Sequence, residues 1–163
     1  MTTAILGIRA VAIDLDGTLL DTIPDLCGAV NLVLADLNFA PLPIDLVKTF
    51  VGKGLGEHMR KSLRAAMGRE ADDGEKARAM SLYKKHYAAH VADQTTIYPG
   101  VVEGLDTFKS RGLPMSVVTN KWATNTETLL AHFGLSGYFD HIACGDPFTT
   151  NISRGCTAKR PAE

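Results

Sequence analysis

One short apolar segment near the start of the chain is followed by a long stretch with helical patterns only, and this order limits the possible folds. Residues 9–15, RAVAIDL, form a short apolar run with β-branched side chains, which predicts a buried strand. Residues 22–93 contain helical patterns only, and from residue 98 strands and helices alternate. Such alternation predicts parallel strands joined by crossover helices. We therefore expect an α/β sheet domain that is interrupted after its first strand by an all-helical insert.

The helices of the insert are predicted from apolar periodicity. The first begins near Pro24, with Thr22 as its expected cap. A glycine-rich turn at residues 52–56 separates the next two helices. The last helix is expected to bury the stripe Ala77, Met80, Tyr83, Tyr87 and Val91. Beyond the insert we expect a helix from Pro99, a strand that runs into Thr119, a helix over about 122–133 and a strand in 139–144.

Charge also separates the insert from the rest of the chain. Residues 53–90 hold nine Lys and Arg against five Asp and Glu, whereas the remainder holds eight against thirteen. We place the α/β core at residues 1–21 and 94–163 and the helical cap at residues 22–93. The basic cap is interpreted either as a solvated helical face or as a lid that helps to attract an anion.

The composition is that of an ordinary globular protein. The chain has 163 residues, 45% of them hydrophobic, and a net charge of -1, so nothing global calls for a nucleic-acid or membrane partner. Its three cysteines lie far apart, which argues against a disulfide framework or a zinc cage. No signal peptide or membrane-spanning run is predicted. We expect a cytoplasmic protein that is a monomer or a weak dimer.

Two carboxylates mark the end of the first strand. Asp14 and Asp16 are two residues apart, so their side chains are predicted to point to the same side. Open α/β sheets place their functional sites at this end of a buried strand. A structural turn rich in Asp and Gly is the alternative interpretation. The position of the pair favours a functional site.

The segment DLDGTLLDT after an apolar strand resembles motif I of the haloacid dehalogenase superfamily of phosphatases. The resemblance continues through VGKG, YPGV, VVTNK and FGLSGYFD, over residues 9 to about 146, and is greatest to bacterial phosphoglycolate phosphatases. It implies a Rossmann-like parallel sheet with a helical cap inserted after motif I. It also implies a Mg²⁺-dependent phosphomonoester hydrolase that forms an aspartyl phosphate, with 2-phosphoglycolate as the expected substrate. Sugar phosphates and pyrophosphate are the alternative substrates.

The resemblance assigns roles to the residues of motif I. Asp14 is implied to be the nucleophile that attacks phosphorus. Asp16 is implied to protonate the leaving group and then to accept a proton from the attacking water. Mg²⁺ would bind Asp14 and the backbone carbonyl of Asp16. Gly17 would leave room for the phosphate, and Thr18 would support the loop.

Motif II and the cap supply the other expected contacts. By resemblance, the Thr119 hydroxyl and the Asn120 N–H bind phosphate oxygens. Lys121 is interpreted as a phosphate or carboxylate partner, or as a surface cation. Lys53, or the N–H groups beside it, would bind the carboxylate of a small phosphorylated acid, or the turn is only a connection between cap helices.

The remaining candidates are expected to be structural. Tyr83 and Tyr87 are assigned to the core of the cap, and Trp122 to packing rather than to the site entrance. The histidines are scattered without metal-ligand spacing: His58, His86, His90, His132 and His141.

The family pattern stops after Gly145-Asp146. The motif III lysine and the acidic motif IV are not found in PFTTNISRGCTAKRPAE, and Lys159 is not assigned the motif III role. The missing C-terminal strand would lie beside the first strand and leave its edge exposed. We therefore expect an incomplete core with impaired activity, after a frame change, a truncation or divergence. The alternative is a catalytically inactive remnant that binds phosphate or a partner.

Overall fold

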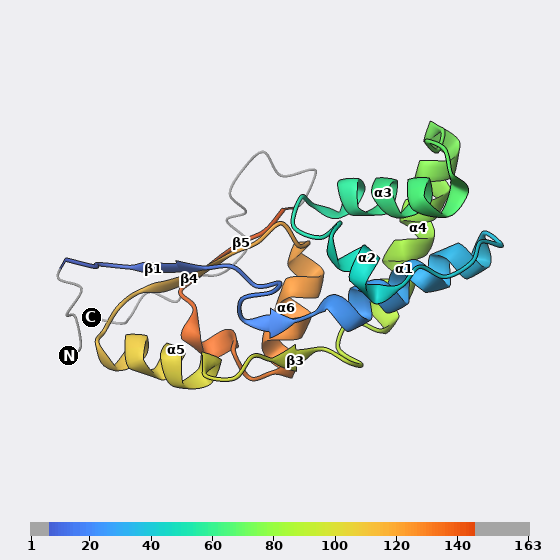
Figure 1. Ribbon diagram of the computed structural model, residues 1–163. Helices are drawn as coiled ribbons and strands as arrows, with labels where there is room; N and C mark the ends of the chain where they lie inside the picture. Colours follow the sequence, from blue (N-terminus) through green and yellow to red (C-terminus); the bar gives the residue numbers. More distant parts are fainter. Residues whose placement is uncertain (1–6, 146–163) are drawn as a thin grey trace.

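The computed structural model describes residues 7–145, which form two lobes (Figure 1). The elements of the α/β lobe are β1 (Val11–Ile13), α5 (Val101–Ser110), β4 (Met115–Val118), α6 (Ala123–His132), the 3-10 helix Ser136–Tyr138 and β5 (His141–Ala143). Those of the helical lobe are α1 (Ile23–Asp36), α2 (Ile44–Lys48), α3 (Leu55–Met67) and α4 (Asp73–Ala89). The predicted α/β core with an all-helical insert after its first strand is confirmed.

The sheet of the α/β lobe is parallel, with strand order β1-β4-β5. Val11 pairs with Met115, and Val117 pairs with both Ile13 and Ile142. Burial of Met115 and Val117 on the central strand anchors this lobe. Within residues 7–145, β1 pairs with β4 alone. β1 is shorter than the predicted segment 9–15 because only its three central residues pair with β4.

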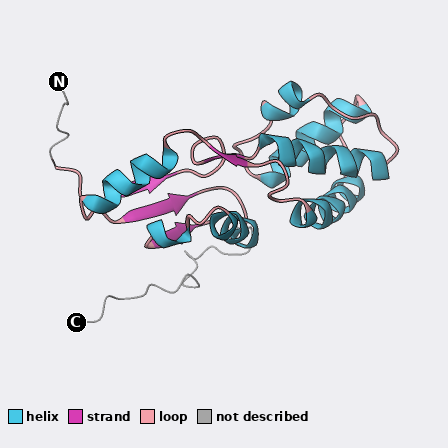
Figure 2. Cartoon of the chain, turned by 90° about the horizontal axis from the view of Figure 1, so that it is seen from below, coloured by secondary structure: helices cyan, strands magenta, loops and turns pink. Residues whose placement is uncertain are grey.

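A two-stranded antiparallel sheet joins the lobes where the chain enters and leaves the helices. β2 (Leu20–Asp21) pairs antiparallel with β3 (Thr96–Ile97), and Figure 2 shows this crossing between the sheet and the helices. Each strand has two residues, which is too few to show the alternation of apolar and polar side chains typical of a strand. The sequence therefore did not predict this two-stranded sheet. It lies close to the proposed core–cap boundaries, and we retain that division as a proposal.

The helical lobe is organised around α1, which contacts α2, α3 and α4. The apolar periodicity that predicts α1 corresponds to a buried face, which includes Leu26, Val30, Val33 and Leu34. In α4 the buried side chains are Ala79, Tyr83 and Tyr87, at spacings of four residues. The assignment of Ala77 to this stripe is wrong, because Ala77 is exposed on another side of the helix.

α4 begins with a reciprocal capping box. Asp72 Oδ1 accepts a hydrogen bond from Glu75 N at 2.8 Å, and Glu75 Oε2 accepts one from Asp72 N at 2.9 Å. These bonds satisfy N–H groups that have no partner within the helix. They therefore define where the polar segment ADDGE ends and the helix starts.

Predictions that concern residues 1–6 and the tail after Gly145, including Cys156 and Lys159, lie outside the described residues. In the part that is described, no helix combines the length and the apolar character needed to cross a bilayer.

Buried Asp25 fastens the first turn of α1 to the segment that leaves the helical lobe. Its carboxylate accepts hydrogen bonds from Gln94 N at 2.9 Å, Thr95 N at 2.8 Å and the Thr95 hydroxyl at 2.6 Å. These bonds join residues that are separated by 69 and 70 positions in the sequence. The Asp25 carboxylate thus holds together the start and the end of the helical lobe, beside the two-stranded sheet of β2 and β3.

We predict that Asp25→Ala lowers the free energy of unfolding by about 3 kcal/mol, because buried donors lose a charged acceptor. Urea denaturation at pH 7 measures the change. Asp45→Asn, on the exposed start of α2, is the control and should shift stability by less than about 0.5 kcal/mol. Equal stability of the two variants would contradict this role of Asp25.

Candidate active site

A cavity of about 80 Å³ lies between the two lobes, at the carboxyl ends of β1 and β4. A volume of that size holds several water molecules or a small ligand group. The lobes contribute different chemistry to its wall. The α/β side supplies Asp14, Asp16, Thr119, Asn120, Lys121, Trp122 and Asn125. The helical side supplies Leu26, Val51, Gly52, Gly54, Leu55, His58, Tyr83 and Tyr87.

Asp14 and Asp16 reach this cavity from the end of β1, as their spacing predicts. Leu15 between them is fully buried. Asp14 is exposed, and its Oδ1 accepts a hydrogen bond from Leu15 N at 2.7 Å. Asp16 Oδ1 accepts a hydrogen bond from the Thr22 hydroxyl at 2.7 Å. The prediction that the Thr22 side chain caps α1 is therefore wrong, because its hydroxyl donates its hydrogen bond to Asp16.

Lys121 connects the two lobes at the site. Its Nζ lies 3.2 Å from Asp16 Oδ1 and donates a hydrogen bond to the Tyr87 hydroxyl at 2.6 Å. Burial lowers the pKa of Lys121, and the Asp16 carboxylate opposes that shift. The interpretation of Lys121 as a surface cation is wrong, since the residue is only 8% exposed. Tyr87 is buried as predicted, but its polar contact with the core was missed.

The loop after β4 brings Thr119 and Asn120 to the same cavity. Thr119 Oγ1 accepts a hydrogen bond from Lys121 N at 3.2 Å. Asn120 Nδ2 donates to the carbonyl oxygen of Gly52 at 3.0 Å, which holds the glycine-rich turn against the core. Gly145 packs closely on this loop, where a Cβ would lie 2.6 Å from the Asn120 carbonyl oxygen. The loop therefore leaves no room for a side chain at that position.

Three residues that the resemblance assigns to the site are exposed and are not among the cavity-lining residues: Gly17, Thr18 and Lys53. Gly17 has a φ of 78°, and its N–H donates to Leu20 O at 2.9 Å, so it shapes the loop after β1. On either side of Lys53, Gly52 and Gly54 do line the cavity. The turn thus presents backbone, not the lysine side chain, to the site.

The helical lobe contributes two buried polar side chains whose role the sequence did not indicate. His58 is 3% exposed and Tyr83 is 1% exposed, with ring centroids 6.2 Å apart in an edge-to-face arrangement. Among residues 7–145, neither His58 Nε2 nor the Tyr83 hydroxyl has a hydrogen-bond partner. The apolar stripe predicted for the last cap helix accounts for the burial of Tyr83, but it cannot reveal a polar atom that lacks a partner.

Burial keeps both of these groups neutral. Together with the charge of Lys121, it lowers the pKa of His58 to about 4. It also raises the pKa of the Tyr83 phenol. At neutral pH the helical side therefore offers an uncharged imidazole and an uncharged phenol to the cavity.

Trp122 lines the cavity, so its assignment to packing alone is wrong. The Lys84 ammonium lies 4.7 Å from the centroid of the Trp122 ring. This cation–π contact adds a second link between α4 and the loop after β4.

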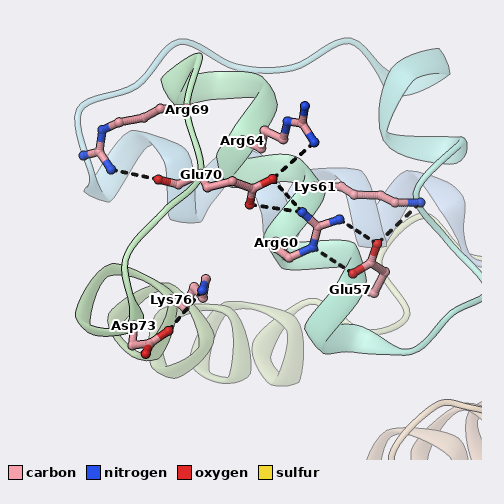
Figure 3. Close-up of polar contacts among 8 residues, drawn as sticks. All are labelled: Glu57, Arg60, Lys61, Arg64, Arg69, Glu70, Asp73 and Lys76. Atoms are coloured by element: carbon pink, nitrogen blue, oxygen red, sulfur yellow. Dashed lines mark hydrogen bonds and ion pairs between the residues drawn. The ribbon is translucent and has the colours of Figure 1, made fainter.

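The basic side chains of α3 are engaged in ion pairs away from the cavity. Figure 3 shows Arg60 between Glu57 and Glu70, at distances of 2.9 and 2.8 Å. The cationic side chain among the described residues that line the cavity is Lys121, which belongs to the α/β lobe and not to α3. The interpretation of the basic cap as a solvated, ion-paired face fits this arrangement better than a lid that attracts an anion.

The oxygen donors fit a Mg²⁺ ion that retains water and substrate oxygens. No group of three or more His, Cys, Asp and Glu could hold a metal within the described residues. Mg²⁺ needs only one or two protein carboxylates when water and phosphate complete its shell. The exposed Asp14 carboxylate meets this need. Since the Asp16 carboxylate is engaged by Thr22 and Lys121, Asp16 would contribute its backbone carbonyl.

The model of the haloacid dehalogenase-like hydrolase family matches residues 11–151. This chain belongs to that family. Phosphoglycolate phosphatase from Nitrosospira multiformis is 42% identical over 141 residues, and that from Neisseria meningitidis is 40% identical over 146 residues. These matches cover 86% and 90% of this chain, and 62% of each relative. The chain thus spans less than two thirds of the relatives' length.

Solved structures of haloacid dehalogenase-like proteins share the fold. The crystal structure of a predicted phosphoglycolate phosphatase from Haemophilus somnus superposes with a TM-score of 0.82 at 27% identity. The match covers 89% of this chain and 65% of that one. The resemblance inferred from motifs I and II is therefore confirmed, as is the fold that it implies.

We predict that Tyr87→Phe lowers the free energy of unfolding by about 2 kcal/mol, because buried Lys121 loses a hydrogen bond. Tyr138→Phe is the matched control. It also removes a tyrosine hydroxyl bonded to a charged residue, Asp106 at 2.7 Å, but at an exposed site. Its effect should stay below about 1 kcal/mol in the same urea titration. Equal losses would show that the Tyr87 contact adds nothing beyond a surface bond.

We also predict that neutral His58 makes the fold sensitive to acid. Its folded pKa of about 4 lies below the unfolded value of 6.5, so the unfolded chain binds the proton first. Stability should therefore fall as the pH drops from 6.5 towards 4, by roughly 2 to 3 kcal/mol at pH 4.5. Urea unfolding at pH 7 and 4.5 measures this loss. His58→Gln should remove the loss and exposed His132→Gln should retain it; the same loss in all three proteins would contradict the assignment.

Proposed function

We propose that this chain contains the catalytic site of a Mg²⁺-dependent phosphomonoester hydrolase that acts on 2-phosphoglycolate through an aspartyl phosphate. The supporting observation is the placement of Asp14 and Asp16 at the end of β1, in one cavity with Thr119 and Asn120. The relatives named phosphoglycolate phosphatase support the choice of substrate.

Asp14 is suited to nucleophilic attack because its carboxylate is exposed at the strand end. One carboxylate oxygen attacks phosphorus, and the bond from phosphorus to the ester oxygen breaks. The resulting aspartyl phosphate is hydrolysed when water attacks the same phosphorus, which divides one difficult displacement into two. Mg²⁺, when bound, offsets the negative charge of the phosphoryl oxygens.

Asp16 is assigned the proton transfers. It protonates the departing alkoxide in the first step and accepts a proton from water in the second. Its bonds to the Thr22 hydroxyl and Lys121 Nζ hold the carboxyl group in one orientation. The Thr119 hydroxyl and the Asn120 N–H are proposed to bind phosphoryl oxygens, where preplaced donors stabilise developing charge.

We predict that Asp14→Asn lowers kcat for 2-phosphoglycolate by at least about 10³-fold, because an amide cannot form the acyl phosphate. Release of inorganic phosphate with Mg²⁺ measures the rate, and removal of the metal with EDTA should abolish it. Asp45→Asn is the control and should retain the activity of the unaltered chain. Turnover that survives Asp14→Asn would contradict the mechanism.

A protein that binds phosphate without turnover is the second candidate. It predicts phosphate binding but no release from any phosphomonoester. Mg²⁺-dependent turnover of 2-phosphoglycolate by the purified chain would exclude it, whereas faster turnover of a sugar phosphate or pyrophosphate would change the proposed substrate.

A further inference from the structure

The cavity wall that the helical lobe contributes contains two buried polar atoms that the proposed chemistry does not use. His58 Nε2 on α3 and the Tyr83 hydroxyl on α4 lack partners among residues 7–145, although both residues line the cavity. A buried polar group without a partner costs about 1 to 3 kcal/mol. Leucine or phenylalanine would fill the same places without that cost. The two atoms are therefore explained better by a ligand than by packing.

A chain of contacts links these atoms to the catalytic acid. Asp16 faces Lys121 at 3.2 Å, and Lys121 donates to Tyr87 at 2.6 Å. The rings of Tyr87 and Tyr83 stack with centroids 5.5 Å apart, and the Tyr83 ring meets that of His58. His58 and Tyr83 thus line the helical side of the cavity whose other side contains Asp14 and Asp16. The leaving group of a phosphoester bound at Asp14 would extend towards this helical side.

The charges around His58 favour an anion at this wall. Lys121 from the core and Lys61 from α3 both disfavour a proton on the imidazole, and Asp16 favours one. Of the two lysines, Lys121 lines the cavity, so its ammonium is the cation that a ligand group at this wall would meet. Tyr83, the remaining titratable group packed on the ring, is neutral. A negatively charged ligand group is therefore stabilised there.

A carboxylate matches the available donors. It has two oxygens that accept hydrogen bonds and no group that donates. A neutral imidazole with hydrogen on Nε2 supplies one donor, and the phenol supplies another. Bonds to a charged acceptor are stronger than bonds between neutral groups. The pair could thus bind one carboxylate without a salt bridge of its own.

We propose that His58 Nε2–H and the Tyr83 hydroxyl bind the carboxylate of the substrate's leaving group and so select phosphorylated carboxylic acids. This inference rests on the proposed function, since it assigns the part of 2-phosphoglycolate that is not transferred. It makes the two residues determinants of specificity, while Asp14 and Asp16 perform the reaction on any phosphomonoester that enters.

Binding without turnover tests the contact directly. The full chain is titrated in EDTA with 2-phosphoglycolate and, separately, with ethyl phosphate, in which a methyl group replaces the carboxylate. Imidazole NMR signals are followed, with the His58 signal assigned through His58→Gln. We expect 2-phosphoglycolate to shift the His58 signal and ethyl phosphate to leave it nearly unchanged. Equal responses to both compounds, or no response to 2-phosphoglycolate, would overturn the inference.

Kinetics with Mg²⁺ provide the second test. Tyr83→Phe removes one hydroxyl and retains the ring, and we expect it to raise KM for 2-phosphoglycolate about 10-fold or more. KM for ethyl phosphate should not change, and the same split is expected for His58→Gln. Tyr138→Phe, which removes a tyrosine hydroxyl at the surface away from the cavity, is the control and should change neither value. Parallel changes for both substrates would overturn the selective role.

The two proposals fail in different ways. If no phosphomonoester is hydrolysed while 2-phosphoglycolate still shifts the His58 signal, the proposed activity is wrong and the carboxylate site stands. If 2-phosphoglycolate is hydrolysed while His58 does not respond to it, the activity stands and the carboxylate site is wrong. Circular dichroism of each variant confirms that its fold is retained.

Discussion

The site depends on a buried lysine with partners on both lobes. Lys121 lies between the Asp16 carboxylate of the loop after β1 and the Tyr87 hydroxyl of α4. An ammonium group removed from water is costly unless it is paired and hydrogen-bonded, so the position of the cation requires both contacts. Three segments that are far apart in the sequence must therefore meet at one point, and the cavity forms around it.

The base of the cap is held by a second buried charge. Asp25 accepts hydrogen bonds from Gln94 and Thr95, in the segment that leaves the helical lobe next to the two-stranded sheet of β2 and β3. The cap is thus fixed near its covalent connections by Asp25 and at the cavity by Lys121, and Asn120 adds the bond to the glycine-rich turn. Together these polar contacts set the distance between the two walls of the site.

The two walls carry different kinds of groups. The α/β wall supplies carboxylates, a hydroxyl and the ammonium of Lys121, which suit phosphoryl transfer. The helical wall supplies a neutral imidazole and neutral phenols, which can bind a ligand group without joining in the proton transfers. The proposed division leaves the reacting groups unchanged and assigns the choice of leaving group to the helical wall.

The sequence by itself determined the order of elements, the family and the position of Asp14 and Asp16, because these follow from periodicity and from residues adjacent in the chain. Strand alternation places both carboxylates on one side, whatever the rest of the molecule does. Only the tertiary structure decided that Lys121 is buried, that Lys53 does not line the cavity, and that His58 and Tyr83 carry buried polar atoms without partners among residues 7–145. Those properties arise from packing between α3, α4 and the loop after β4, and contacts across such distances leave no periodic trace in the sequence.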